Sequence, residues 1–206
     1  NVVSRNSSIR SAGTSKFHER LQVAKEFGAT HVLILPGYPS GDIRAEECHE
    51  WLNEAIQKSV PVADDLGITL TIANLGYGAE TYGSSDYLLS TCEASGNRVK
   101  ITYDVGNFLF ANEDPIEALD KVFPHVVHVH FKDWEILPSE IDGSWAGMDG
   151  TLYLGKTLGE GVVDLPAAVN RLQELDYNGY ISPEYEGITD PWKAIDIGVS
   201  YLRTLI

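Results

Sequence analysis

Short apolar runs alternate along this chain with segments of helical periodicity. Phe17, Leu21 and Phe27 repeat at helical spacing, and Gly28 supplies the left-handed residue that often ends a helix. An apolar run at residues 31–36 then predicts a buried strand. Such strand and helix units recur about every thirty residues, which is the rhythm of a parallel sheet covered by helices. The pattern predicts an α/β fold and favours a barrel over a sandwich.

Further helices have recognisable starts and stops. Residues 45–66 predict a long helix that Pro61 should kink or divide, because the ring removes a backbone donor and clashes with the preceding turn. Asp114 and Asp190 each precede a proline, and Asp164 precedes another helical pattern, so all three are expected to be N-caps. Each predicted strand therefore has a helix to cover it.

The segment from Trp134 to Val162 shows no sustained period and is rich in glycine and aromatic residues. We expect a loop of this length to be functional or disordered. Since it follows a strand directly, one interpretation is a wall or lid over a site, with Trp134, Trp145 and Tyr153 as contacts. The alternative is that these aromatic residues pin a long loop to the surface.

Composition limits the class of protein. With 206 residues and 43% hydrophobic content, residues 1–206 are expected to form a single domain. A formal charge of −15 argues against a nucleic-acid partner, whose phosphates bind lysine and arginine. No apolar run approaches the roughly 18 residues of a membrane span, so no membrane partner is expected. Cys48 and Cys92 lack the spacing of a disulfide or zinc motif, which predicts buried thiols and a cytoplasmic protein.

Candidate chemistry lies at the ends of three apolar strands, where Asp104, His130 and Glu184 stand. In a parallel barrel the carboxyl ends of the strands gather on one face, so these side chains can converge. Carboxylate and imidazole ligands suit Mn²⁺, Mg²⁺ or Co²⁺. Singly, an acid there could be a helix cap and the histidine a satisfied core residue; together they predict a metal site. A fourth similar strand, residues 68–74, carries Ala73 at the corresponding place.

Several motifs, taken in order, resemble one known family. The motifs are Gly67–Asn74, Asp104–Phe108, His128–Asp133, Leu158–Gly161 and Tyr177–Glu184. On these motifs the chain is similar, over roughly residues 15–206, to the sugar phosphate isomerase/epimerase family with the xylose isomerase-like TIM barrel, which includes ketose 3-epimerases and inosose-type enzymes. The resemblance implies a (β/α)₈ barrel, here N-terminally short. The first two strand-helix units are expected to be absent from residues 1–206, with Asn1-Val-Val as the remainder of a third strand. Either the sequence is a fragment, or the barrel is open, or a partner closes it.

The resemblance also implies roles. Such enzymes hold one divalent metal ion with Glu, Asp, His and Glu, which map onto position 73, Asp104, His130 and Glu184. The two glutamates move a proton at a carbon next to a carbonyl group, so Glu184 is the expected catalytic residue. Ala73 removes one ligand and one proton carrier, and such groups contribute about 10²–10⁴ in rate. An introduced substitution and a natural divergence both explain the alanine.

The expected substrate contacts carry alternatives of their own. Lys132 could equally lie in a solvated turn, Asn107 stands where many relatives have a histidine, and period two turns Asn74 away from the face of Ala73. Glu186 is expected to make a structural bond or face solvent. The full set of expected contacts is Asn74, Asn107, His128, Lys132, Trp134 and Glu160.

We therefore expect a metal-dependent isomerase or epimerase of a small sugar or polyol, impaired by Ala73. Manganese is a candidate ion. One alternative is a dehydratase of an inosose or of dehydroshikimate, which also begins with proton loss beside a carbonyl group. Another is a sugar-binding protein without catalysis. An exposed parallel edge would also favour association into a homo-oligomer.

Overall fold

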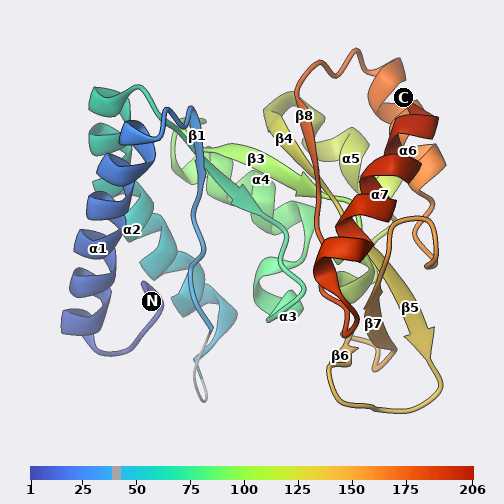
Figure 1. Ribbon diagram of the computed structural model, residues 1–206. Helices are drawn as coiled ribbons and strands as arrows, with labels where there is room; N and C mark the ends of the chain where they lie inside the picture. Colours follow the sequence, from blue (N-terminus) through green and yellow to red (C-terminus); the bar gives the residue numbers. More distant parts are fainter. Residues whose placement is uncertain (39–42) are drawn as a thin grey trace.

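A curved parallel sheet forms the centre of the molecule (Figure 1). The computed structural model describes residues 1–38 and 43–206. Within those residues the sheet has five strands in the order β1-β2-β3-β4-β8, and all neighbours are parallel. The strands are β1 His31–Leu33, β2 Thr69–Ala73, β3 Lys100–Asp104, β4 Val126–Phe131 and β8 Tyr180–Pro183.

Helices follow the strands as the sequence predicts. The N-cap carboxylates of Asp114, Asp164 and Asp190 each accept hydrogen bonds from backbone N–H groups of the first helical turn, which confirms all three caps. Gly67, with φ of +66°, ends α2 in the left-handed conformation. Pro61 was expected to kink or divide this helix; division is wrong, because α2 runs through Pro61 as one helix. The helices are α1 Ser7–Glu26, α2 Ala45–Leu66, α3 Ala79–Tyr82, α4 Ser85–Ala94, α5 Pro115–Val122, α6 Leu165–Glu174 and α7 Pro191–Leu205, with 3₁₀ turns η1 Asn107–Ala111 and η2 Phe123–His125.

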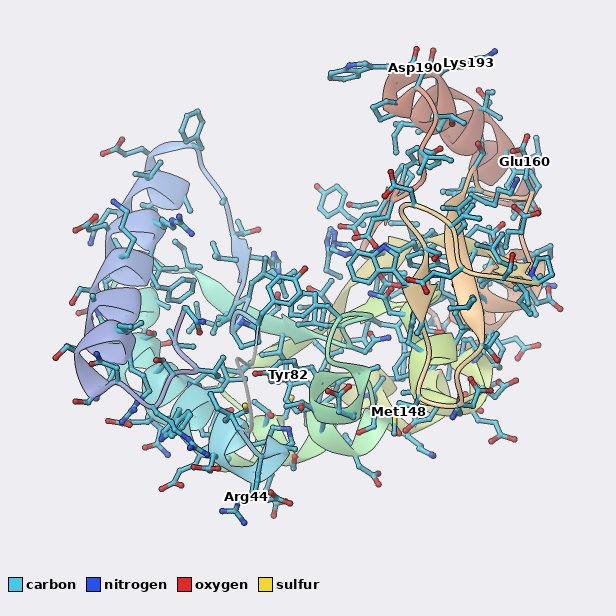
Figure 2. All side chains as sticks on the ribbon, turned by 90° about the horizontal axis from the view of Figure 1, so that it is seen from below. Arg44, Tyr82, Met148, Glu160, Asp190 and Lys193 are labelled. Carbon is cyan, nitrogen blue, oxygen red and sulfur yellow. The ribbon has the colours of Figure 1, made fainter. Side chains whose placement is uncertain are left out.

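The sheet curls into an open half-barrel (Figure 2). A closed barrel of this class has eight parallel strands, whereas the parallel sheet of the described residues has five. Residues 1–3 are not a strand, although the Val2 N–H donates to the Pro36 carbonyl at 3.0 Å. The prediction of a buried strand at residues 31–36 needs correction, because β1 is a short edge strand and Leu35 beyond it is exposed.

The two faces of the sheet differ in chemistry. Side chains on one face join the hydrophobic core, among them Ile72, Tyr103 and Phe131. The other face is polar: Thr102 donates to Thr71 at 2.8 Å. Because alternate side chains along a strand share a face, this polar face also carries the residues that end the strands at the candidate site.

The segment after β4 is not an irregular loop, so that prediction is wrong. It forms a three-stranded antiparallel sheet of β5 Asp133–Leu137, β6 Trp145–Ala146 and β7 Leu152–Lys156, in the order β5-β7-β6. Gly155 permits β7 to approach the backbone of Glu186, because an added Cβ would clash with the Glu186 carbonyl group. The small sheet is thus held against the chain that leaves β8.

Over the described part of the chain, no helix has the length and apolar character required to cross a membrane.

Candidate metal centre

Three residues at the carboxyl ends of β3, β4 and β8 come together: Asp104, His130 and Glu184. Asp104 pairs with His130 in the register of β3 and β4, and the Glu184 N–H donates to the Phe131 carbonyl at 2.8 Å. Asp104, His130 and Glu184 each offer one ligand atom, and these atoms all lie within 4.8 Å of one another. The Nδ1 atom of His130 lies 3.1 Å from Oε1 of Glu184. Adjacent parallel strands therefore deliver the convergence that the sequence predicts.

Backbone and amide groups fix the Asp104 carboxylate. Its Oδ1 atom accepts from the N–H groups of Gly106 and Asn107 at 3.0 and 2.9 Å, which leaves Oδ2 facing the other site residues. The Asn74 side chain brackets the backbone of Asp104: its Nδ2 donates to the Asp104 carbonyl at 2.9 Å, and its Oδ1 accepts the Asp104 N–H at 3.0 Å. The carboxylate is therefore held in place before any ion or substrate binds.

Lys132 joins the carboxylates of the site. It is only 3% exposed, and its Nζ lies 3.4 Å from Oδ2 of Asp104, 3.0 Å from Oε2 of Glu184 and 3.2 Å from Oε1 of Glu186. Burial of an unpaired ammonium group would cost several kcal/mol. The acidic partners offset that cost, so Lys132 is a buried part of the centre and not a residue of a solvated turn.

Burial also sets the protonation of the ligands. It raises the pKa of Asp104 to about 6, against the opposing effect of Lys132. Burial lowers the pKa of His130, although Glu184 opposes the shift, so its imidazole is neutral at pH 7 and able to bind a cation. For Lys132, burial alone would lower the pKa, but the three carboxylates outweigh it and raise the value, which keeps the ammonium charged.

These side chains line a cavity of about 190 Å³ with two unlike sides. One side, from β3, β4 and the chain after β8, carries the charged and imidazole groups. The other side, from β1, β2 and the chain beyond them, is mainly apolar: Leu33, Leu35, Ala73, Leu75 and Tyr77. Trp145 of β6 also reaches the cavity, so the antiparallel sheet contributes to its wall.

The donor set fits a divalent ion in part. Two carboxylates and a neutral imidazole are ligands that Mn²⁺, Mg²⁺ or a related ion accepts. The end of β2 offers the methyl group of Ala73, which cannot bind a metal ion. Among the residues that the structure describes, this cluster thus offers three potential ligands.

The structure divides the six predicted substrate contacts into two groups. Asn74, Asn107 and Lys132 line the cavity. Asn74 has both amide groups committed to Asp104, whereas the Oδ1 atom of Asn107, a residue 5% exposed, has no hydrogen-bond partner. An acceptor of that kind in a cavity wall is suited to a substrate hydroxyl group.

The other three expected contacts do not line the cavity. His128 lies two residues before His130 on β4 and shares a 2.9 Å hydrogen bond with Ser182. Trp134 is fully buried and packs its ring against Phe110 at a centroid distance of 4.8 Å. Glu160 lies in the loop after β7, on the outer side near Asp190 and Lys193, as Figure 2 shows.

Glu186 was expected to make a structural bond or to face solvent. It pairs with Lys132 at 3.2 Å and its side chain is partly exposed, and in addition it lines the cavity, which was not expected. Period two from Glu184 placed both acids on one face of the strand, and this signal could have identified Glu186. Tyr77, which no motif singled out, also lines the cavity and packs against Tyr38 in a tilted arrangement with ring centroids 4.2 Å apart.

Comparison with known proteins gives the fold a context. The chain is 25% identical over 169 residues to an inosose dehydratase of Geobacillus kaustophilus, a match that covers 76% of this chain and 53% of that protein. The chain therefore spans about half the length of this curated relative.

Solved structures share the fold at lower sequence identity. A D-tagatose 3-epimerase-like protein superposes with a TM-score of 0.76 at 23% identity, over 100% of this chain and 74% of that one. The IOLI protein with a bound zinc atom gives 0.77 at 17% identity, over 98% and 72%. A Mycobacterium smegmatis barrel protein in complex with magnesium gives 0.73 at 18% identity, over 100% and 69%.

The family model described as "Xylose isomerase-like TIM barrel" matches residues 1–205, which is nearly the whole chain. The curved parallel sheet and the helices that follow its strands agree with that match. The chain therefore belongs to the xylose isomerase-like TIM barrel family.

Proposed function

We propose that the protein binds one divalent metal ion and moves a proton at a carbon next to a carbonyl group of a small sugar or cyclic polyol. The observation that carries this proposal is the convergence of Asp104, His130 and Glu184, with ligand atoms within 4.8 Å of one another, in a cavity of about 190 Å³. A bound ion would polarise the carbonyl oxygen and stabilise the negative charge that forms on it.

The chain's own residues supply the remaining functions. Glu184 lies at the cavity and is the candidate base, because its carboxylate can take a proton from a bound substrate. Lys132 places a positive charge beside it, which stabilises an anionic oxygen and orients the carboxylate. The free Oδ1 atom of Asn107 can accept a hydrogen bond from a substrate hydroxyl group.

Isomerisation, epimerisation and dehydration all begin with this proton loss. Epimerase-like proteins among the fold relatives support the first two, and the inosose dehydratase relative favours dehydration as a second candidate. The charged side of the cavity can form hydrogen bonds with hydroxyl groups, and the net charge of −15 disfavours an anionic substrate, so a neutral, hydroxyl-rich substrate is suited to the site. Manganese is the first ion to test, with magnesium and zinc beside it because fold relatives carry them.

Deuterium exchange tests the proposal without knowledge of the natural substrate. The protein is incubated in D₂O with Mn²⁺ and, separately, an inosose, D-fructose or D-tagatose, and NMR follows the proton next to the carbonyl group. We expect exchange with at least one of them. Glu184→Gln should abolish it, while Glu160→Gln, at a surface acid outside the cavity, should not. Absence of exchange with all three probes would refute the proposal.

A further inference from the structure

Lys132 lies where three carboxylates meet. Its side chain is 4% exposed, and its Nζ atom lies 3.0 Å from Oε2 of Glu184, 3.2 Å from Oε1 of Glu186 and 3.4 Å from Oδ2 of Asp104. An ammonium group has three N–H donors, so each carboxylate can accept one of them. Because a buried ammonium group without partners is strongly unfavourable, the head of Lys132 has to find its partners inside the centre.

Two of these partners are also candidate metal ligands. Oδ1 of Asp104 accepts two backbone N–H groups, so Oδ2 is the atom left for a cation, and it is the atom that faces Lys132. Glu184 places Oε1 3.1 Å from Nδ1 of His130 and Oε2 beside the lysine. An ammonium group that moved closer to Asp104 and Glu184 would therefore occupy the oxygen atoms that a cation needs.

Glu186 is the partner that the ligand cluster does not include. It lines the cavity, and the close approach of β7 at Gly155 fixes its backbone, so its carboxylate reaches Lys132 from a defined position. Three carboxylates and one ammonium group leave two negative charges, which one divalent ion neutralises. Among these groups, a single negative charge would remain without Glu186, and Lys132 would pair with the two candidate ligands alone.

These contacts give Glu186 a role of its own. On the basis of the metal ion in the function proposed above, we infer that Glu186 is a positioning residue, which holds the Lys132 ammonium group away from the oxygen atoms of Asp104 and Glu184 that bind the cation. The lysine thereby keeps its positive charge beside the cavity without blocking the centre. Groups that contact metal ligands from outside typically change metal affinity by about 10- to 100-fold when they are altered.

Glu186→Asp tests the contact separately from the charge. The variant keeps the negative charge but shortens the side chain by one methylene group, so the carboxylate is withdrawn from Nζ of Lys132, which lies 3.2 Å away in the unaltered protein. Calorimetric titration with Mn²⁺ should show a loss of affinity of about tenfold or more. Glu160→Asp, the same change at a surface acid outside the cavity, should bind as the unaltered protein does. Equal affinity in the two variants would overturn the inference, because water or another group would then replace Glu186.

A second background shows whether the effect passes through Lys132. In Lys132→Met the competing ammonium group is absent, so adding Glu186→Asp should leave the Mn²⁺ affinity unchanged. An equal loss with and without the lysine would mean that Glu186 acts on the ligands directly, and would overturn the inference while the proposed function stands. If Lys132→Met does not fold, the comparison of Glu186→Asp with Glu160→Asp at equal urea midpoints decides the matter. Absence of Mn²⁺ binding by the unaltered protein would overturn the proposed function and the inference together.

Discussion

Asp133 should be among the most sensitive positions for stability, although it binds nothing in the cavity. It is 1% exposed, and its carboxylate accepts four backbone N–H groups. Oδ1 accepts from Trp134 at 2.9 Å and from Val163 at 3.1 Å, while Oδ2 accepts from Gly159 at 3.0 Å and Gly161 at 2.9 Å. One side chain thus joins the start of β5 to the loop before α6.

The magnitude follows from the donors that Asp133→Ala would leave unpaired. Gly159 and Gly161 lie near the surface, so water can replace the lost acceptor there. The N–H groups of Trp134 and Val163 belong to buried residues, and each buried donor without a partner costs about 1–3 kcal/mol. Asp133→Ala should therefore lower the free energy of unfolding by about 2–6 kcal/mol, a large part of the 5–15 kcal/mol typical of a domain.

Urea denaturation followed by circular dichroism measures this change. With an m-value of about 2 kcal/mol/M, the midpoint should fall by about 1–3 M. Asp149→Ala is the matched control, because Asp149 is exposed on the same antiparallel sheet segment and accepts a single N–H group, that of Thr151. Its midpoint should hardly move. Equal midpoints for the two variants would show that the buried carboxylate does not hold the loop, and the reasoning would fail.

Three further outcomes follow from the structure. Burial raises the pKa of the Cys48 thiol and raises that of the Cys92 thiol to about 11. A thiol reagent at pH 8 should therefore modify both cysteines quickly only after denaturation, and fast labelling of the native protein would contradict this. Burial raises the pKa of Asp104 to about 6, and a ligand must lose its proton to bind a metal ion. The Mn²⁺ affinity measured by calorimetry should therefore be constant above that pH and fall as the pH drops below it. A flat profile from pH 8 to 5 would speak against Asp104 as a ligand. Gly155→Ala places a Cβ against the backbone of Glu186 and should lower the urea midpoint; an unchanged midpoint would mean that the contact can relax freely.

Local rules were enough to predict that the three candidate ligands converge. Each of Asp104, His130 and Glu184 ends an apolar strand, and the geometry of parallel strands converts that local fact into a meeting point. The helix caps were predictable for the same reason, since the Asp114 carboxylate bonds only to its own first turn. In both cases the contacts that matter are specified within a few residues of the chain.

Features that depend on distant pairing were missed. The antiparallel sheet after β4 is short, and its strands face mixed surroundings, so Trp134 is buried while Ile136 on the same strand is exposed. Hydrophobic and polar residues therefore do not alternate regularly along this strand, and the sequence pattern does not reveal it. The direction of the Glu160 loop is set by Asp133 more than twenty residues earlier, at Gly159 and Gly161. The site's acidic cluster likewise depends on how deeply Lys132 is buried, which the sequence does not reveal.

Calorimetric titration with Mn²⁺ tests the central claim most directly, and β4 offers its own control. His130 and His128 lie two residues apart on the same face of one strand, but only His130 belongs to the ligand cluster and lines the cavity. We predict one bound ion per chain in the unaltered protein and in His128→Gln, and a loss of affinity of at least about tenfold in His130→Gln. Absence of binding by the unaltered protein, or equal affinity in the two variants, would contradict the assignment of the metal centre.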